Sequence, residues 1–206
     1  MRKKLPIGIQ TFAEIRQEGH YYVDKTPHIL RLLDEGKYYF LSRPRRFGKS
    51  LLIDTLAELF EGNRPLFDGL HAEAHWDWSK SYPVIRISFA DGVLHSAERL
   101  QQRILDNLRQ NAERLGVTFP PGLDVPGQFG ELIRQARASH GQRAVVLVDE
   151  YDKPILDNIT DGAIARQMRD GLRDLYSVIK GQDAHIQFAM LTGVSKFSKV
   201  SLFSGL

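Results

Sequence analysis

The chain has 206 residues, of which 42% are hydrophobic and 26% are charged, a balance typical of a soluble globular protein with room for one substantial domain. Its formal net charge of +3 is mildly basic, weaker than the concentrated charge of a dedicated DNA-binding domain. The absence of cysteine excludes disulfides, thiolate zinc sites and cysteine nucleophiles, and it suits the cytoplasm. No run approaches the roughly 18 apolar residues of a membrane span. We therefore expect a cytoplasmic protein without a membrane partner.

The beginning of the chain is predicted to form a segment of its own. This segment spans residues 1–36, ahead of a core that spans residues 37–206. It is expected to be irregular, apart from one short helix near residues 12–17. Thr26 followed by Pro27 predicts a second helix, with the threonine hydroxyl as its cap and the proline in its first turn.

Apolar runs alternate with helical patterns throughout the core. Strands are predicted at residues 38–41, 84–89, 144–148 and 186–191, and helices at about residues 48–61, 100–115, 129–136 and 164–179. Residues 63–82 are predicted to form a connecting segment with little regular structure. The run at 144–148 is continuously apolar, as expected for a strand buried on both faces of a parallel sheet. The alternation predicts an α/β fold with a parallel sheet.

A short loop joins the first predicted strand to the helix that follows it. Gly48, Lys49 and Ser50 match the end of the phosphate-binding pattern G-x-x-x-x-G-K-[ST], whereas Arg43 stands where the first glycine is expected. A helix N-terminus attracts phosphate through its unpaired N–H groups and its partial positive charge. Lys49 would then reach the β- and γ-phosphates, and the Ser50 hydroxyl would hold Mg²⁺. An exposed basic loop before an ordinary helix is the alternative that this stretch alone leaves open.

We predict that a nucleotide contacts this loop and the first turn of its helix. The predicted contacts are Arg43, Pro44, Arg45, Arg46, Phe47, Gly48, Lys49, Ser50 and Leu51. The arginines are expected beside the phosphates. Contact with a nucleic-acid backbone, or simple solvation, are the alternatives for these three side chains.

Two acids, Asp149 and Glu150, end the apolar run at 144–148. In a P-loop nucleoside triphosphatase this is the Walker B arrangement, in which the first acid contacts Mg²⁺ and the second polarises the attacking water. Because open parallel sheets bind ligands outside the carboxyl ends of their strands, the acids and the loop are expected at one edge. A polar strand end entering a turn is the alternative. At the tip of the last strand, Thr192 or Ser195 would sense the γ-phosphate, although Thr-Gly is also ordinary turn chemistry.

Five ordered motifs resemble the bacterial AAA-ATPase-like family. They lie at residues 5–8, 22–26, 39–50, 148–154 and 191–197. The resemblance runs from residue 5 to the end of the chain, and the family itself carries arginine at the position of Arg43. It implies a P-loop NTPase fold of the AAA/ASCE type, a three-layer α/β/α sandwich with a mostly parallel sheet. It also implies that the sensor strand lies between the loop strand and the acid strand.

The same resemblance implies ATP and Mg²⁺ as the cofactors and assigns the site residues. Lys49 would act on the phosphates, Ser50 and Asp149 would hold the metal, and Glu150 would be the catalytic base. Thr192, proposed above from its place at the strand tip, is the third catalytic candidate beside Glu150 and Lys49. Residues 1–36 would pack on the nucleotide site, with residues 22–26 near the base or ribose. The choice between ATP and GTP stays open.

Members of this family typically join the ATPase region to a C-terminal PD-(D/E)XK-type nuclease domain. The predicted function is therefore an Mg-ATP-binding and hydrolysing domain that regulates or drives a separate effector such as a nuclease. The alternative is an ATP-dependent binding module or switch with little turnover that engages a protein or nucleic-acid partner. A homo-oligomer is compatible with both. Because the sequence stops at Leu206, before the further strand, helical lid and effector domain that the family leads us to expect, we interpret it as an N-terminal piece of a longer protein or as a truncated reading frame.

Overall fold

A computed structural model of the chain describes residues 2–195 and shows an α/β protein built on a parallel sheet. The four described strands run in the order β1-β4-β3-β2. Their bounds are β1 Tyr38–Ser42, β2 Val84–Ser88, β3 Ala144–Asp149 and β4 Ile186–Gly193. The prediction of a parallel sheet is confirmed. So is the implied strand order, because β4 lies between the loop strand β1 and the acid strand β3.

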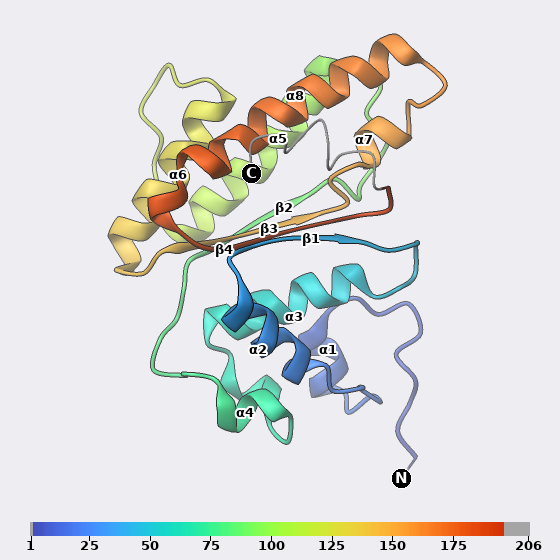
Figure 1. Cartoon of the computed structure of the whole chain (residues 1–206), viewed down its shortest axis with the longest axis vertical. Coiled ribbons are helices and arrows are strands. Elements are labelled where there is room, and N and C mark those ends of the chain that lie inside the picture. Colours follow the sequence, from blue (N-terminus) through green and yellow to red (C-terminus); the bar gives the residue numbers. More distant parts are fainter. Residues whose placement is uncertain (1, 196–206) are drawn as a thin grey trace.

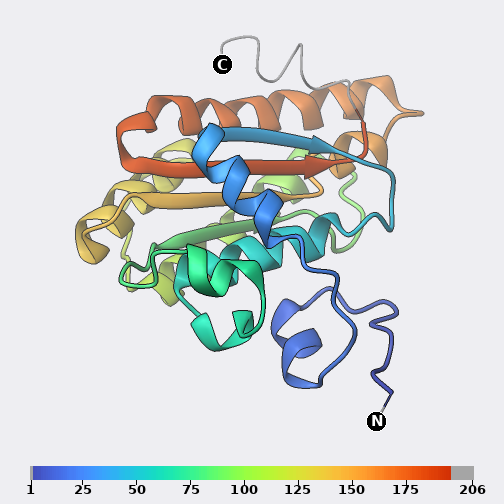
Figure 2. The same ribbon diagram turned by 60° about the horizontal axis from the view of Figure 1, so that its bottom comes forward.

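Helices cover both faces of this sheet and give the molecule three layers (Figures 1 and 2). On one face lie α1 Phe12–Gln17, α2 Thr26–Glu35, α3 Lys49–Glu61, the 3₁₀ helix η1 Arg64–Phe67 and α4 His71–His75. On the other lie α5 Ala97–Leu115, α6 Val125–His140, α7 Lys153–Leu156 and α8 Gly162–Gly181, followed by the 3₁₀ helix η2 Asp183–His185. Within the part of the chain that the structure describes, no helix is long and apolar enough to cross a membrane.

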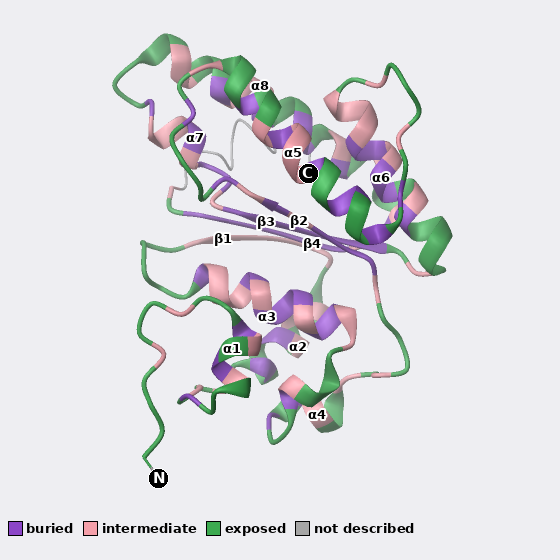
Figure 3. Ribbon diagram, turned by 180° about the vertical axis from the view of Figure 1, so that it is seen from behind, coloured by how far each residue is buried: buried purple, intermediate pink, exposed green. Residues whose placement is uncertain are grey.

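The sheet divides the hydrophobic core into two halves, and the interior strand β3 contributes to both. Val145 and Leu147 pack into the cluster around α3, whereas Val146 and Val148 pack into the cluster around α5, α6 and α8. Every residue of β3 is buried, and Figure 3 shows the sheet between the helical layers, with β3 and β4 mostly buried and β1 of intermediate burial. Each such buried valine or leucine contributes about 1.5–3 kcal/mol to the free energy of unfolding. This rigid centre fixes the loops at the strand ends.

The outer edge of β2 is covered by side chains of α5 instead of a further strand. Asn111 Oδ1 accepts a hydrogen bond from the Arg86 N–H (2.8 Å), and Asn111 Nδ2 donates to the Arg86 carbonyl (2.6 Å). Asn107 makes the same pair of contacts with the backbone of Ser88, at 2.9 and 3.3 Å. The two amides satisfy backbone groups that an edge strand would otherwise leave unpaired.

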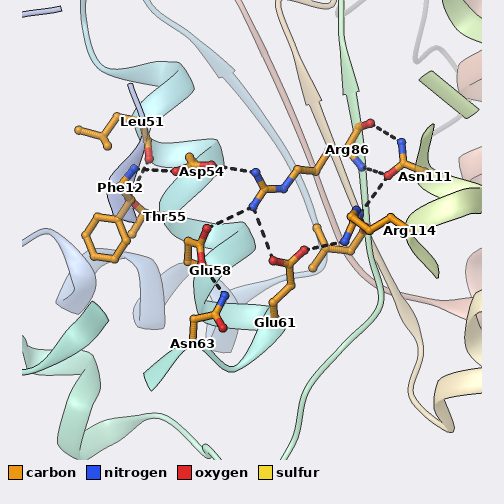
Figure 4. A network of polar contacts seen from close by, with 11 residues as sticks. Phe12, Leu51, Asp54, Thr55, Glu58, Glu61, Asn63, Arg86, Asn111 and Arg114 are labelled. Atoms are coloured by element: carbon orange, nitrogen blue, oxygen red, sulfur yellow. Dashed lines mark hydrogen bonds and ion pairs between the residues drawn. The ribbon is translucent and has the colours of Figure 1, made fainter. Parts of the chain in front are cut away.

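One carboxylate on α3 ties the beginning of the chain to the sheet. Asp54 Oδ2 accepts a hydrogen bond from the Phe12 N–H (2.6 Å), and Asp54 Oδ1 accepts from Arg86 Nη1 (2.8 Å). The Arg86 guanidinium also lies 3.8 Å from carboxylate oxygens of both Glu58 and Glu61 (Figure 4). The start of α1 is therefore anchored to the helix that follows the β1 loop.

Two local predictions need correction. Thr26 does not cap α2: the helix begins at Thr26 itself, with Lys25 ahead of it, and no side chain caps it. The Thr26 hydroxyl instead donates to Asp24 Oδ1 (2.7 Å) and accepts from the Ala72 N–H (3.0 Å), which fastens α2 to α4. The stretch 63–82 contains η1 and α4 where little regular structure was expected, and α7 was not predicted.

Candidate functional site

A cavity of about 750 Å³ lies where the carboxyl ends of β1 and β3 meet the beginning of the chain. Its volume falls in the range of small-ligand sites. Three segments form the wall: residues 6–10, residues 45–51 apart from Phe47, and Glu150. Arg45, Arg46 and Lys49 bring three positive charges to this wall and Glu150 brings one negative charge. The excess of positive charge favours an anionic ligand.

The loop between β1 and α3 presents backbone donors to this cavity. Gly48 precedes the helix in the left-handed region at φ 75°, and no side chain caps the start of α3. The first N–H groups of a helix have no partner within it, so these groups of α3 are left to a ligand. An N–H cluster at the positive end of a helix dipole suits a phosphate.

Lys49 places its ammonium group over the loop. The residue is only 7% exposed, and Nζ donates a hydrogen bond to the carbonyl of Pro44 (3.1 Å). No carboxylate lies within ion-pair distance of this ammonium among the described residues. A buried cation without an anionic partner is costly, and a bound phosphate would supply that partner.

The acidic turn after β3 is held by the end of β4. Asp149 is buried, and its Oδ1 accepts hydrogen bonds from the Thr192 hydroxyl (2.5 Å) and from the Glu150 N–H (3.0 Å). Within the described residues, Oδ2 of the same carboxylate accepts no hydrogen bond, so this oxygen is available to a cation. Thr192 is fully buried and its hydroxyl is engaged by Asp149. These contacts favour a positioning role for Thr192, and neither residue belongs to the cavity wall.

Glu150 is the one acid of the turn that reaches the cavity wall. Burial raises the pKa of its carboxyl above the usual range, the negative charge of Asp149 raises it further, and the cations Lys153, Lys49 and Arg45 oppose the shift. Its backbone is left-handed at φ 53°. Such a conformation costs a non-glycine residue about 1–2 kcal/mol.

Backbone strain is concentrated at this cavity. Among the described residues, the non-glycine residues with positive φ are Arg46 (67°) and Glu150, and both line the wall. Strain of this kind persists only where the surrounding contacts over-determine the backbone, and it gathers at functional sites. The loop and the acidic turn each contribute one such residue to the wall.

Six of the nine predicted nucleotide contacts line the cavity, and three do not. The Arg43 N–H donates to the Gly193 carbonyl (3.1 Å), and its guanidinium turns back to the carbonyl of Ser42 (3.1 Å). The Pro44 carbonyl accepts the hydrogen bond from Lys49, and Phe47 is 65% exposed. The structure thus brings together Arg45, Arg46, Gly48, Lys49, Ser50, Leu51 and Glu150.

The N-terminal segment reaches the cavity through residues that overlap the motif at 5–8 but were not predicted as site residues. Residues 6–10 form one wall, whereas residues 22–26, expected near a base or ribose, are absent from it. Tyr22 packs against the Phe12 ring with 5.1 Å between centroids, and Asp24 accepts a hydrogen bond from the His71 N–H (2.7 Å). Asp152, a buried acid in the turn after β3, was also not predicted as a site residue. Lys196 and Phe197, the end of the last motif, lie outside the described residues.

The donors at this edge fit magnesium better than a metal with several protein ligands. Within residues 2–195 no cluster of three or more histidines or acids could hold a metal ion. Mg²⁺, however, takes only one or two protein ligands and fills its remaining positions with water and substrate phosphates. The Ser50 hydroxyl at the wall and the Asp149 Oδ2 beside Glu150 are oxygen donors of that kind.

Known sequences place the chain in a family. A sequence profile described as "Predicted AAA-ATPase" matches residues 6–203. An "Uncharacterized protein in vnfD 5'region" of Azotobacter chroococcum mcd 1 is 63% identical over all 206 residues, and the match covers 40% of that protein's length. The chain therefore spans less than half the length of this curated relative. No solved structure matches the chain. With a profile match over nearly its whole length, the chain belongs to the predicted AAA-ATPase family.

Proposed function

We propose that this chain is a P-loop ATPase domain of the AAA/ASCE type that binds Mg-ATP and hydrolyses it. The observation that carries the proposal is the cavity at the carboxyl ends of β1 and β3, where the uncapped start of α3, three cations and one acid converge. The membership of a predicted ATPase family supports the same activity.

ATP would bind with its phosphates on the loop. The N–H groups at the start of α3 and the Lys49 ammonium would hold the β- and γ-phosphates, with Arg45 and Arg46 beside them. Ser50 and Asp149 would hold Mg²⁺, which when bound neutralises charge on the phosphate oxygens. Residues 6–10 would form the wall next to the rest of the nucleotide.

Hydrolysis would be an in-line displacement by water. Glu150 takes a proton from the water as the water oxygen bonds to the γ-phosphorus, and the bond from that phosphorus to the bridging oxygen breaks, giving ADP and inorganic phosphate. The raised pKa of Glu150 makes its carboxylate a stronger base than an exposed glutamate. Lys49 and the loop stabilise the charge that develops on the phosphate oxygens.

Two substitutions test binding and chemistry separately. Lys49→Ala should weaken Mg-ATP binding about 10- to 100-fold, because a charge-assisted contact is lost. Glu150→Gln should keep the affinity and lower phosphate release at least ~100-fold, because the amide cannot take the proton. Calorimetric titration and a phosphate-release assay measure the two effects, and Lys180→Ala, at an exposed position in the last turn of α8, is the matched control.

The outcomes separate the candidate functions. A wild-type chain that fails to bind Mg-ATP would refute the proposal, and a Glu150→Gln variant that hydrolyses at the wild-type rate would remove Glu150 from the mechanism. Binding without phosphate release would instead select an ATP-dependent switch with little turnover.

We further propose that the nucleotide state is read by an effector in a longer protein, a nuclease being one such effector. In the curated relative the matched region is 40% of the chain, which leaves sequence for such a part. A nucleic-acid partner of Arg45 and Arg46 would show as a salt-dependent DNA shift.

A further inference from the structure

Asp152, two positions after the proposed base Glu150, is a buried acid. Asp152 is 2% exposed, and its Oδ2 accepts hydrogen bonds from the backbone N–H groups of Val194 (2.9 Å) and Ser195 (2.6 Å). No lysine, arginine or histidine pairs with it among the described residues. A buried carboxylate is costly, so this one is held by two charge-assisted hydrogen bonds from the backbone alone.

Asp152 completes a series of contacts between the acidic turn and the end of β4. The Thr192 hydroxyl donates to Asp149 Oδ1 (2.5 Å), and the Tyr151 N–H donates to the Thr192 carbonyl (3.0 Å). Gly193 packs so closely beneath the turn that a Cβ there would lie 2.2 Å from the Tyr151 ring and 2.6 Å from Asp152 Oδ1. The turn is thus fixed to β4 at successive residues with no spare room.

Glu150 lies within this series of contacts and has a backbone conformation that is unfavourable for a non-glycine residue. Its φ of 53° is left-handed, and its carbonyl accepts a hydrogen bond from the Lys153 N–H (3.0 Å). Asp149 on one side and Asp152 on the other are both bonded to the end of β4. A strained residue keeps its backbone only when its neighbours determine it.

The same end of β4 also contacts the phosphate loop. The Arg43 N–H donates to the Gly193 carbonyl (3.1 Å), and the Ser42 hydroxyl donates to the Val194 carbonyl (3.0 Å). Residues 193–195 therefore touch the loop on one side and Asp152 on the other. These residues thus connect the loop to the acidic turn through the carboxylate of Asp152.

We propose that Asp152 is a positioning residue that holds Glu150 at the γ-phosphate by fixing the acidic turn to the end of β4. The inference rests on the proposed ATPase function and adds to it a residue that does not line the cavity. A misplacement of about 1 Å of a catalytic group can cost on the order of 100-fold in rate. Asp152 should consequently govern turnover and leave nucleotide affinity alone.

The test compares two acid-to-amide changes in the same segment. Asp152→Asn keeps the shape and removes the charge that holds two N–H groups. Asp157→Asn is the control, since Asp157 lies at the end of α7 and pairs with Lys153 (2.5 Å) without touching β4. We expect Asp152→Asn to lower kcat about 10- to 100-fold with KM and Mg-ATP affinity within ~3-fold of wild type. Asp157→Asn should keep kcat within ~3-fold of wild type, even if it lowers the melting temperature as much as Asp152→Asn does.

Asp152→Glu is a second variant in case Asp152→Asn does not fold. It keeps the negative charge but displaces the carboxylate by one methylene group. It should also lower kcat at unchanged affinity. Wild-type kcat in a folded Asp152 variant, or equal kcat losses in the Asp152 and Asp157 variants at equal stability, would overturn the positioning role. A wild-type chain without phosphate release would be a failure of the ATPase proposal itself, which this inference would not survive.

Discussion

Thr192→Val tests whether the hydroxyl of β4 orients Asp149. The substitution keeps the shape of a fully buried side chain and removes the donor that lies 2.5 Å from Asp149 Oδ1. A hydrogen bond to a buried charged group contributes about 1.5–3 kcal/mol. Asp149 Oδ1 retains the Glu150 N–H at 3.0 Å, and the new methyl group gains at most ~0.8 kcal/mol. We expect the free energy of unfolding to fall by about 1–2 kcal/mol.

Thr192→Ser is the matched control because it keeps the hydroxyl and loses the methyl group, at about 1 kcal/mol. The two variants should therefore lose similar stability in a urea titration, while differing in metal dependence. Mg²⁺ should strengthen nucleotide binding less in Thr192→Val than in wild type, for ADP as well as ATP, because Asp149 is no longer oriented. Thr192→Ser should keep the wild-type response.

Calorimetric titrations of ATP and ADP, each with and without Mg²⁺, decide the outcome. An unchanged magnesium response in Thr192→Val would refute the orientation of Asp149 by this hydroxyl. A loss of affinity for ATP with no change for ADP would instead indicate the γ-phosphate sensor predicted from the sequence.

Three further changes probe charge, packing and the base. Lys153→Met should move the acid limb of the kcat–pH profile to higher pH: Lys153 lowers the pKa of Glu150, its removal raises that pKa, and the rate is lost as Glu150 becomes protonated; an unmoved limb would count against Glu150 as the base. Arg86→Met should lower the unfolding free energy by about 1–3 kcal/mol in low salt and by less in high salt, because it takes the cationic partner from Asp54 and Glu58 while Glu61 keeps Arg114; equal losses at both salt concentrations would contradict the electrostatic cause. Gly193→Ala should destabilise the fold by about 1–3 kcal/mol through overpacking; wild-type stability would show that the turn has room to move.

The sequence predicts most of the fold because the strong signals are local. The apolar run at 144–148 becomes β3, and the helices with long amphipathic patterns fall within a few residues of their predicted bounds. The failures are positions where a distant partner decides. Thr26 is a good cap by its residue type, but Asp24 and Ala72 occupy its hydroxyl. The four-residue α7 is too short to show a period.

The site is predictable as an order of motifs and unpredictable as a set of contacts. The loop ending at Ser50 and the acids at Asp149 and Glu150 could be assigned to one edge of a parallel sheet, since motif order and strand direction suffice for that. Which residues line the cavity depends on how residues 6–10 pack against the loop and the acidic turn, which are distant in sequence. No local sequence pattern specifies that packing. The hydroxyl of Thr192 likewise meets Asp149 only because β4 pairs beside β3.

The amides of Asn107 and Asn111 have a consequence for assembly. At the outer edge of β2 they already occupy the N–H and carbonyl groups of Arg86 and Ser88, and Arg114 takes the Val84 carbonyl. A strand from a second molecule would find almost no groups left to bond there, so this edge cannot template cross-β growth. Should copies of the chain associate, the sheet would not be extended from one molecule to the next through β2.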